Sequence, residues 1–253
     1  MAWIDCQKAF DRVPHSWIIK SLELIGINKK VIAFITKAMT YWRTCMCLHA
    51  ENELIDLKIQ YGIFQGDSIS PSLFCICLIP LTEQLNGLNT GYEEHITKTK
   101  ISHLPYMDDL KLIAKSEEEL RKQIQTVKTF SDDIRMDFGL EKCAKITYKK
   151  GKLILSQNLV IDINREIQEL EQGKKYKYLG IEESEGIQHQ QMKEGLKQEY
   201  RRRLRMILKS ELNARKKITA FGALVVPVLR YSFDIINWRI EEIKKLTGKL
   251  ERC

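Results

Sequence analysis

Apolar residues recur every three or four positions in several stretches of the chain, which is the pattern of helices with one buried face. Such stretches begin at Pro14, at Lys30 and at Ser116. The third opens on a Ser-Glu-Glu-Glu capping box, and its pattern continues until Gly139. A continuously apolar helix is expected after Pro71. These segments predict packing helices around a common core.

Short apolar runs bounded by turn residues predict strands between these helices. They cover residues 3–5, 42–48, 54–61, 101–105, 110–113, 144–148, 153–155 and 178–181. From about residue 188 the pattern is helical, with helices expected at 188–212, 216–226 and 240–250. A mixed part followed by an all-helical part predicts class α+β, with a boundary near residues 182–186.

The composition fits a globular protein with an uneven charge. The chain has 253 residues, of which 44% are hydrophobic, and its formal net charge is +8. Basic residues gather in 193–217, where Lys197, Arg201, Arg202 and Arg205 are candidates for contact with a nucleic-acid backbone. The alternative is a solvated helix face.

Cysteine usage and hydropathy bear on location. The seven cysteines are an odd number without zinc-site spacing, which favours a reduced, intracellular protein. Cys45 and Cys47 are expected to be small buried residues, with half a metal site as the alternative. The chain shows no signal-peptide core and no apolar run of the ~20 residues that a membrane span needs. Neither secretion nor membrane insertion is expected.

Acidic residues supply the candidate chemistry. The tetrapeptide Tyr106-Met107-Asp108-Asp109 lies between two apolar runs, which predicts a hairpin turn with adjacent carboxylates. Adjacent carboxylates repel each other unless a proton or cation relieves the charge, so a divalent-metal site is one interpretation. An acidic turn without a ligand is the other, because Asp is common in turns. Asp5, at the end of another apolar stretch, favours the metal site.

Three segments in this order resemble motifs A, B and C of reverse transcriptases. They are the Asp5 strand with the turn that follows it, the Gly-rich turn 62–71, and the hairpin around Asp108. Residues 139–145 are similar to motif D, and residues 176–181 are similar to the primer grip, motif E. The resemblance is closest to LINE-type, non-LTR retrotransposon polymerases and covers nearly the whole chain.

The resemblance implies a right-hand polymerase fold. Residues 1–185 would form the palm, an antiparallel sheet with packing helices that includes the primer-grip segment. Residues 186–253 would form a partial, basic helical thumb. Family members carry a fingers region before motif A, and this region is expected to be largely absent because Asp5 follows the start so closely. Met1 is therefore expected to be an internal methionine, and the chain a fragment of a retrotransposon polyprotein.

The resemblance also implies an RNA-directed DNA polymerase that adds nucleotides to a primer 3′-hydroxyl with two divalent ions. Asp5 and Asp108 would be the central metal ligands, supported by Asp109. Hard oxygen ligands select Mg²⁺, with Mn²⁺ as a substitute. Lys142 lies where the family places a lysine that protonates pyrophosphate, and a solvent-facing lysine is the alternative. Asp11 falls past the strand and is expected to cap the following helix or fix its turn.

Further residues are assigned to nucleotide and primer by the same resemblance. Phe10 would block the 2′-hydroxyl of a ribonucleotide, and a core phenylalanine is the alternative. Gln65 and Gly66 would contact nucleotide and template, where the alternative is a turn and helix cap. The nucleotide-binding candidates also include Tyr106 and Met107. The primer-grip candidates are Tyr178, Leu179 and Gly180, for which an ordinary edge strand is the alternative.

The implied partners are an RNA template, a DNA primer and deoxynucleoside triphosphates. A rival interpretation is a catalytically silent remnant whose basic thumb still binds nucleic acid. The three carboxylates favour activity, while the missing fingers favour the remnant. An RNA-templated RNA polymerase accounts less well for Phe10. A group II intron maturase or a telomerase would share the palm, but the thumb resembles LINE-type sequences more closely.

Overall fold

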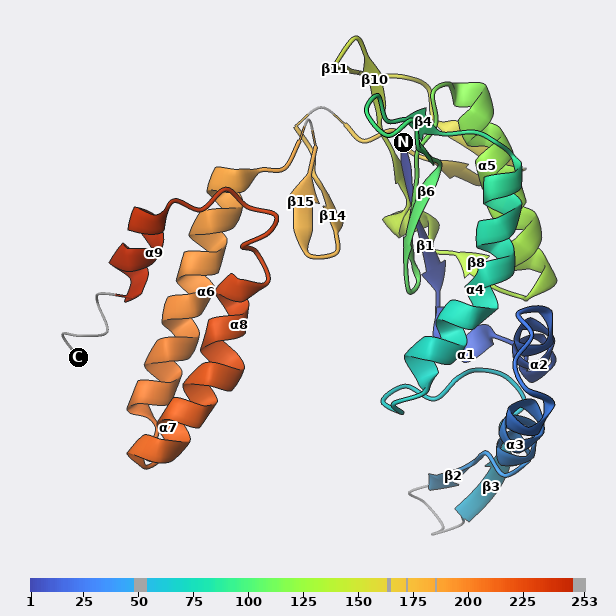
Figure 1. Ribbon diagram of the computed structural model, residues 1–253, viewed down its shortest axis with the longest axis horizontal. Coiled ribbons are helices and arrows are strands. Elements are labelled where there is room, and N and C mark those ends of the chain that lie inside the picture. The colour runs from blue at the N-terminus through green and yellow to red at the C-terminus, as the bar shows by residue number, and fades with distance from the viewer. Residues whose placement is uncertain (48–53, 163–164, 172, 185, 248–253) are drawn as a thin grey trace. The chain divides into compact units, whose positions relative to one another are not determined.

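The computed structural model describes residues 1–47, 54–162, 165–171, 173–184 and 186–247 (Figure 1). The chain divides into two compact units, Met1–Gln172 and Gly173–Cys253. Each unit has its own cluster of buried apolar residues. None of the helices within the described ranges is both long and apolar enough to cross a membrane.

The first unit is built around an antiparallel sheet with β1 (Ala2–Gln7) at its centre. The strand order is β6 (His103–Tyr106), β7 (Asp109–Leu112), β1 and β8 (Asp137–Phe138), and β9 (Ala144–Lys145) also pairs with β1. Ala2, Trp3 and Ile4 are all buried although neighbours on a strand point to opposite faces. Both faces of β1 are therefore covered.

Helices accompany this sheet, and those after the first follow the order that the apolar periodicity predicted. They are α1 (Ala9–Arg12), α2 (His15–Leu24), α3 (Lys29–Thr40), α4 (Ser70–Gly87) and α5 (Glu117–Asp133). Figure 1 shows α4 and α5 side by side along the sheet, with α2 against α4. The side chain of Ser116 accepts a hydrogen bond from the Glu119 amide, which confirms the predicted helix start.

Four two-stranded hairpins complete the first unit. They are β2 (Arg43–Cys47) with β3 (Leu54–Lys58), β4 (Tyr92–Glu93) with β5 (Lys100–Ile101), β10 (Thr147–Lys149) with β11 (Lys152–Ile154), and β12 (Leu159–Asp162) with β13 (Arg165–Ile167). A 3-10 turn, η1 (Leu140–Lys142), links β8 to β9. The hairpins extend from the central sheet and its helices.

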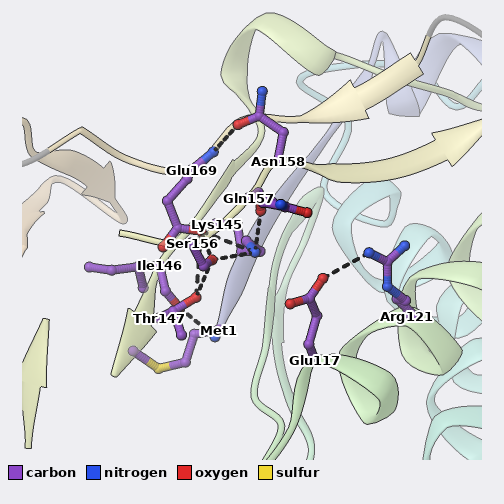
Figure 2. Close-up of polar contacts among 10 residues, drawn as sticks. All are labelled: Met1, Glu117, Arg121, Lys145, Ile146, Thr147, Ser156, Gln157, Asn158 and Glu169. Carbon is purple, nitrogen blue, oxygen red and sulfur yellow. Dashed lines mark hydrogen bonds and ion pairs between the residues drawn. The ribbon is translucent and has the colours of Figure 1, made fainter. Parts of the chain in front are cut away.

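A buried lysine of β9 is bound to the segments that follow β11 and β13 (Figure 2). The side chain of Lys145 is 1% exposed, and that of Glu169 is 5% exposed. Lys145 Nζ lies 3.1 Å from Glu169 Oε2 and donates to Ser156 Oγ and to the Gln157 carbonyl oxygen, both at 2.7 Å. The three N–H donors of its ammonium group therefore have three oxygen acceptors nearby. Burial of a paired and hydrogen-bonded charge fixes β9 to the segments around it.

The second unit is a hairpin followed by helices. The hairpin joins β14 (Tyr176–Tyr178) to β15 (Ile181–Glu183). The helices are α6 (His189–Lys209), α7 (Ala214–Ala220), the π-helical turn η2 (Phe221–Val225), α8 (Val226–Arg230) and α9 (Ile240–Thr247). Tyr200 and Ile207 of α6 pack with Val225 and Leu229 in its core.

Some predictions differ from the structure. The helix expected to continue to Gly139 ends at Asp133, because Asp137 and Phe138 pair with β1 instead. Cys45 is exposed rather than buried, since its strand pairs only with β3. The backbone of Cys47 is described but the burial of its side chain is not, and residues 248–250 of the helix expected to reach residue 250 lie outside the described ranges.

Two more differences concern a boundary and a cap. The predicted first domain ended at residue 185, whereas the contacts divide the chain at residue 172 and place the hairpin β14–β15 in the second unit. The Tyr231 hydroxyl donates to the Leu179 carbonyl oxygen at 2.6 Å, which binds the hairpin turn to a helix end. Asp11 lies within α1, and the N-cap of α2 is Pro14, so Asp11 does not cap α2, while its alternative role in fixing the turn stays a prediction.

Candidate active site

The sheet brings two of the predicted acidic residues face to face. Asp5 of β1 is the direct antiparallel partner of Asp109 of β7. Tyr106 pairs with Asp109 to close the β6–β7 hairpin, so Met107 and Asp108 form its two-residue turn. Met107 has a φ of +54°, a left-handed conformation that costs a residue with a side chain roughly 1–2 kcal/mol. The predicted acidic hairpin is therefore confirmed, with its strain at the turn.

The carboxylates differ in exposure, and they repel one another. The Asp5 side chain is 15% exposed, while Asp108 is exposed at the turn. Burial raises the pKa of Asp5, which Lys142 opposes and Asp108 reinforces. Burial also raises the pKa of Asp109, with further contributions from Asp108 and Asp5. The three carboxylates thus interact. Asp5 comes from β1, Asp109 from β7, and Asp108 from the turn between β6 and β7.

One oxygen of Asp5 lacks the partner that burial normally demands. Oδ2 of Asp5 is buried and accepts no hydrogen bond from the described residues. The nearest cation is Lys142, whose Nζ lies 3.5 Å away on a side chain that is 65% exposed. A buried carboxylate oxygen without a hydrogen bond is costly. Within the described parts of the chain, Glu169 Oε1 is also buried without one, so what distinguishes Asp5 is that it lies directly opposite the carboxylate of Asp109.

A tight turn encloses the backbone of Asp5. The Gly139 amide donates to the Asp5 carbonyl oxygen at 2.8 Å, and the Asp5 amide donates to Cys143 Sγ at 3.4 Å. Burial raises the pKa of the Cys143 thiol to about 11, so the sulfur is neutral. The turn 139–143 therefore holds Asp5 from the side opposite to β7, and it also carries Lys142.

A divalent cation fits the chemistry of this pair. Within the described parts of the chain, no three Asp, Glu, His or Cys side chains are gathered closely enough to enclose a metal ion. The donors present are nevertheless hard carboxylate oxygens, which Mg²⁺ and Mn²⁺ prefer. A cation beside Asp5 and Asp109 would satisfy the orphan oxygen and offset the burial, and after it the repulsion, that raise both pKa values.

Phe10 lies against the core next to this site. Its ring stacks on Phe74 of α4, with centroids 4.3 Å apart and an angle of 12° between the rings. Phe10 is partly buried, while Phe74 is completely buried. Phe10 is thus a packing residue with part of its surface accessible. This is compatible both with a core phenylalanine and with a residue that blocks a 2′-hydroxyl.

Gly62 and Ile63, which precede Gln65 and Gly66, pack against the backbone of α1. The Ile63 amide donates to the Phe10 carbonyl oxygen at 2.7 Å. Gly62 has a φ of +90°, and a Cβ atom there would lie 2.8 Å from the Asp11 carbonyl oxygen. Gln65 and Gly66 follow on an exposed turn that leads into α4. This path ties the predicted nucleotide-binding turn to the chain that carries Phe10.

The remaining nucleotide-binding candidates lie on the acidic hairpin. The Tyr106 side chain is 59% exposed. Met107 is partly buried, and its sulfur lies 3.7 Å from Cys75 Sγ of α4. The hairpin turn therefore rests on the same helix that supports Phe10.

The primer-grip candidates and the basic residues belong to the second unit. Leu179 and Gly180 form the turn of β14–β15 with φ values of +48° and +78°, and Tyr178 is buried beneath it. On α6, Lys197 contacts Glu194 at 2.9 Å, and Arg202 contacts Glu199 at 2.7 Å. Arg201 and Arg205 are exposed and line one hollow with Gln198 and Lys209.

Sequence reasoning missed the surroundings of the site rather than its carboxylates. Gly139 was interpreted as the end of a helix, and Cys143 had no role beyond membership of a motif. Both residues contact Asp5 across more than a hundred positions of sequence. No local pattern signals such a contact, because it depends on the pairing of β1 with β8 and β9.

Comparison with known proteins places the chain among polymerases. Residues 1–182 match the family model of reverse transcriptase (RNA-dependent DNA polymerase). The Pol polyprotein of the type-1 retrotransposable element R2 of Popillia japonica is 30% identical over 57% of this chain and 23% of the relative. That of the type-2 element R2DM of Drosophila melanogaster is 22% identical over 100% of this chain and 24% of the relative. The chain spans about a quarter of the length of these relatives.

A solved structure supports the fold. The structure of apo telomerase from Candida tropicalis has a TM-score of 0.53, with 14% sequence identity over 97% of this chain and 44% of that chain. At such low identity the similarity concerns the fold alone. It agrees with the arrangement of helices and antiparallel strands described above.

Proposed function

The chain belongs to the reverse transcriptase family, as a domain of the LINE type, and we propose that it catalyses RNA-directed DNA synthesis as the palm and thumb of a retrotransposon polymerase. The observation that carries the proposal is the opposed pair of Asp5 and Asp109, in which a buried carboxylate oxygen of Asp5 has no hydrogen-bond partner. Two carboxylates that face each other across paired strands, one with a buried oxygen, are costly to hold together unless a cation or a proton relieves their charge.

The carboxylates would hold divalent ions. Asp5, Asp108 and Asp109 supply hard oxygen ligands from β1 and from the β7 turn, and this donor set suits Mg²⁺, with Mn²⁺ as a substitute. Two bound ions would activate the primer 3′-hydroxyl and stabilise the charge on the leaving pyrophosphate. Because the metal-free carboxylates repel one another, part of their electrostatic cost is recovered only with cations present.

Other side chains would orient the reactants. Lys142 extends from the turn that encloses Asp5, with its Nζ 3.5 Å from Asp5 Oδ2, and its ammonium group would meet or protonate a phosphate at the carboxylates. Phe10, supported by Phe74, would leave too little room for a 2′-hydroxyl. The exposed turn at Gln65 and Gly66 would contact the nucleotide and template, and Tyr106 and Met107 would contact the nucleotide from the hairpin.

The second unit would bind the nucleic acid. The turn of Tyr178, Leu179 and Gly180 would contact the primer as the primer grip. On α6, Arg201 and Arg205 are the cations best placed for phosphates, since Lys197 and Arg202 already contact glutamates of the same helix. The substrates would be an RNA template, a DNA primer and deoxynucleoside triphosphates.

Primer extension tests this proposal. The native chain should extend a DNA primer on an RNA template with deoxynucleotides and Mg²⁺. Asp108→Asn keeps the size of the side chain but removes its charge, and should slow extension at least about a hundredfold, as losses of preorganised charge stabilisation commonly do. Asp133→Asn is the matched control, because Asp133 lies at the exposed end of α5. Extension by Asp108→Asn at the control's rate would refute the metal assignment, and no extension by the native chain would favour a silent remnant that only binds nucleic acid.

A further inference from the structure

Gly139 lies so close to the buried Asp5 Oδ2 that a side chain at position 139 would collide with this oxygen. A Cβ atom built on Gly139 would lie 2.7 Å from Asp5 Oδ2, and 3.4 Å from Gln7 Cγ. Carbon and oxygen atoms that are not bonded do not approach to 2.7 Å without repulsion. The same residue donates its amide to the Asp5 carbonyl oxygen at 2.8 Å, so it cannot move away without breaking that hydrogen bond.

The backbone conformation does not explain a glycine here. Gly139 has a φ of −80° and a ψ of 73°, close to the inverse γ-turn that any L-residue adopts. An alanine would therefore bring no backbone strain. The nearest new contacts of its methyl group would be with the Asp5 carboxylate and, less closely, with Gln7.

We propose that Gly139 is a positioning residue that leaves the space in which the Asp5 carboxylate takes its metal-binding orientation. The inference rests on the proposed function, because it assumes that the Asp5 carboxylate in this orientation binds a divalent cation. A methyl group at position 139 would turn the carboxylate about its side-chain bonds, since Oδ2 is the end of a rotatable group. This rotation would move Oδ2, the Asp5 oxygen that accepts no hydrogen bond from the described residues.

Metal binding is the first readout. Titration of the full chain with Mn²⁺, followed by the loss of the free-ion electron paramagnetic resonance signal, should show binding that Asp5→Ala removes. Gly139→Ala should weaken that binding by at least about tenfold, as changes to groups that orient a metal ligand commonly do. Gly87→Ala is the matched control, because Gly87 is in the same unit and a Cβ atom there meets nothing within 4 Å.

Stability without metal is the second readout. Urea unfolding of native, Gly139→Ala, Asp5→Ala and doubly substituted chains forms a double-mutant cycle. If the methyl group meets the Asp5 carboxylate, any fall in the unfolding midpoint caused by Gly139→Ala should shrink to less than about half when Asp5 is already alanine. If Gly139→Ala does not fold, the double variant should fold.

The outcomes separate this inference from the proposed function. Unchanged Mn²⁺ affinity in a folded Gly139→Ala chain would overturn the inference. An equal loss of stability in both backgrounds would also overturn it, because the methyl group would then be meeting something other than Asp5. Absence of Mn²⁺ binding by the native chain would instead refute the proposed metal site, and the unfolding cycle would still decide whether Gly139 makes room for Asp5.

Discussion

Lys145 is a buried ionisable residue and Asp5 a partly buried one on the neighbouring strand, and their charges have different surroundings. Lys145 Nζ has Glu169, Ser156 and a backbone carbonyl as partners, so its burial needs no further ligand. Asp5 keeps a buried oxygen without a hydrogen bond. Glu169 Oε1 is also buried without a hydrogen bond from the described residues, but Glu169 faces the Lys145 ammonium group, whereas Asp5 faces the carboxylate of Asp109. Asp5 is therefore the carboxylate whose partner across the sheet adds to its electrostatic cost.

The structural role of Lys145 predicts a large loss of stability on its removal. Lys145→Met leaves the Glu169 carboxylate buried, with its partner charge gone, which typically costs about 3–5 kcal/mol. Lys152→Met, at an exposed position of β11, should change the free energy of unfolding by less than about 0.5 kcal/mol. Urea denaturation measures both values.

A second substitution checks the cause of that loss. Lys145→Met combined with Glu169→Leu removes both charges, and should recover most of the stability that the single variant loses. A double variant as unstable as Lys145→Met alone would show that the lysine acts through its packing rather than through the ion pair.

His15 gives the first unit a pH dependence. Burial lowers the pKa of His15, whose Nε2 lies 3.1 Å from the Gly62 carbonyl oxygen. The unfolded chain, with an ordinary pKa near about 6.5, then binds a proton more readily than the folded chain. The contribution of His15 to stability is complete above about pH 6.5, and is lost as the pH falls through the lower folded pKa.

The measurement is the thermal midpoint between about pH 7.5 and pH 5. The native midpoint should fall on acidification, and His15→Gln should flatten part of that fall because glutamine does not titrate. His103, whose pKa burial also lowers, should account for a remaining slope of the same sign. Parallel profiles for native and His15→Gln chains would contradict the assignment.

At the level of elements, the sequence predicted what local patterning determines. Periodicity located α2 to α5, and apolar runs on both sides of the acidic pair located the β6–β7 hairpin. The predicted helix end at Gly139 was wrong because Arg135 adopts a φ of +59°, after which Asp137 and Phe138 pair with Gln7 and Cys6. That pairing is a contact between distant segments, and apolar periodicity within α5 does not contain it.

Polar strands were the other class of element that the pattern concealed. The stretch from Gln157 to Lys175 has no clear periodicity, but it forms the hairpin β12–β13. Leu159 and Ile167 are its two buried members and face each other in the register. Two apolar residues separated by a polar turn are too few to distinguish a strand pair from a loop.

Helix α6 allows the cations that pair within the helix to be distinguished from those that do not. Arg201 and Arg205 are exposed, whereas Lys197 and Arg202 contact Glu194 and Glu199. Arg201→Gln with Arg205→Gln should reduce the slope of log affinity against log salt by about 0.9 for each lost phosphate contact. Lys197→Gln with Arg202→Gln should reduce it less. Filter binding of a primer–template at several salt concentrations compares the two variants with the native chain. The native slope in both variants would mean that neither pair contacts the backbone, and an equal reduction in both would mean that pairing within the helix does not decide which cations do.

The whole molecule separates the proposed chemistry from the proposed binding surface. The carboxylates lie in Met1–Gln172, and the basic helix lies in Gly173–Cys253. The net charge of +8 is carried disproportionately by the second of these segments, as its lysines and arginines show. Attraction of a nucleic acid by long-range charge and the reaction at the carboxylates should therefore depend on different residues.

This division predicts that carboxylate substitutions change the extension rate and arginine substitutions change the affinity for primer–template. Asp108→Asn with Asp109→Asn should abolish primer extension but retain the affinity for primer–template, because removing negative charge from unit 1 takes no phosphate contact away from α6. Arg201→Gln with Arg205→Gln should raise the primer–template concentration needed for half-maximal extension, and a higher concentration should restore the rate. Extension rates and binding isotherms of the same preparations provide the test. A carboxylate variant that lost affinity as strongly as the arginine variant would show that binding depends on the catalytic carboxylates, and that the two functions are not divided between the units.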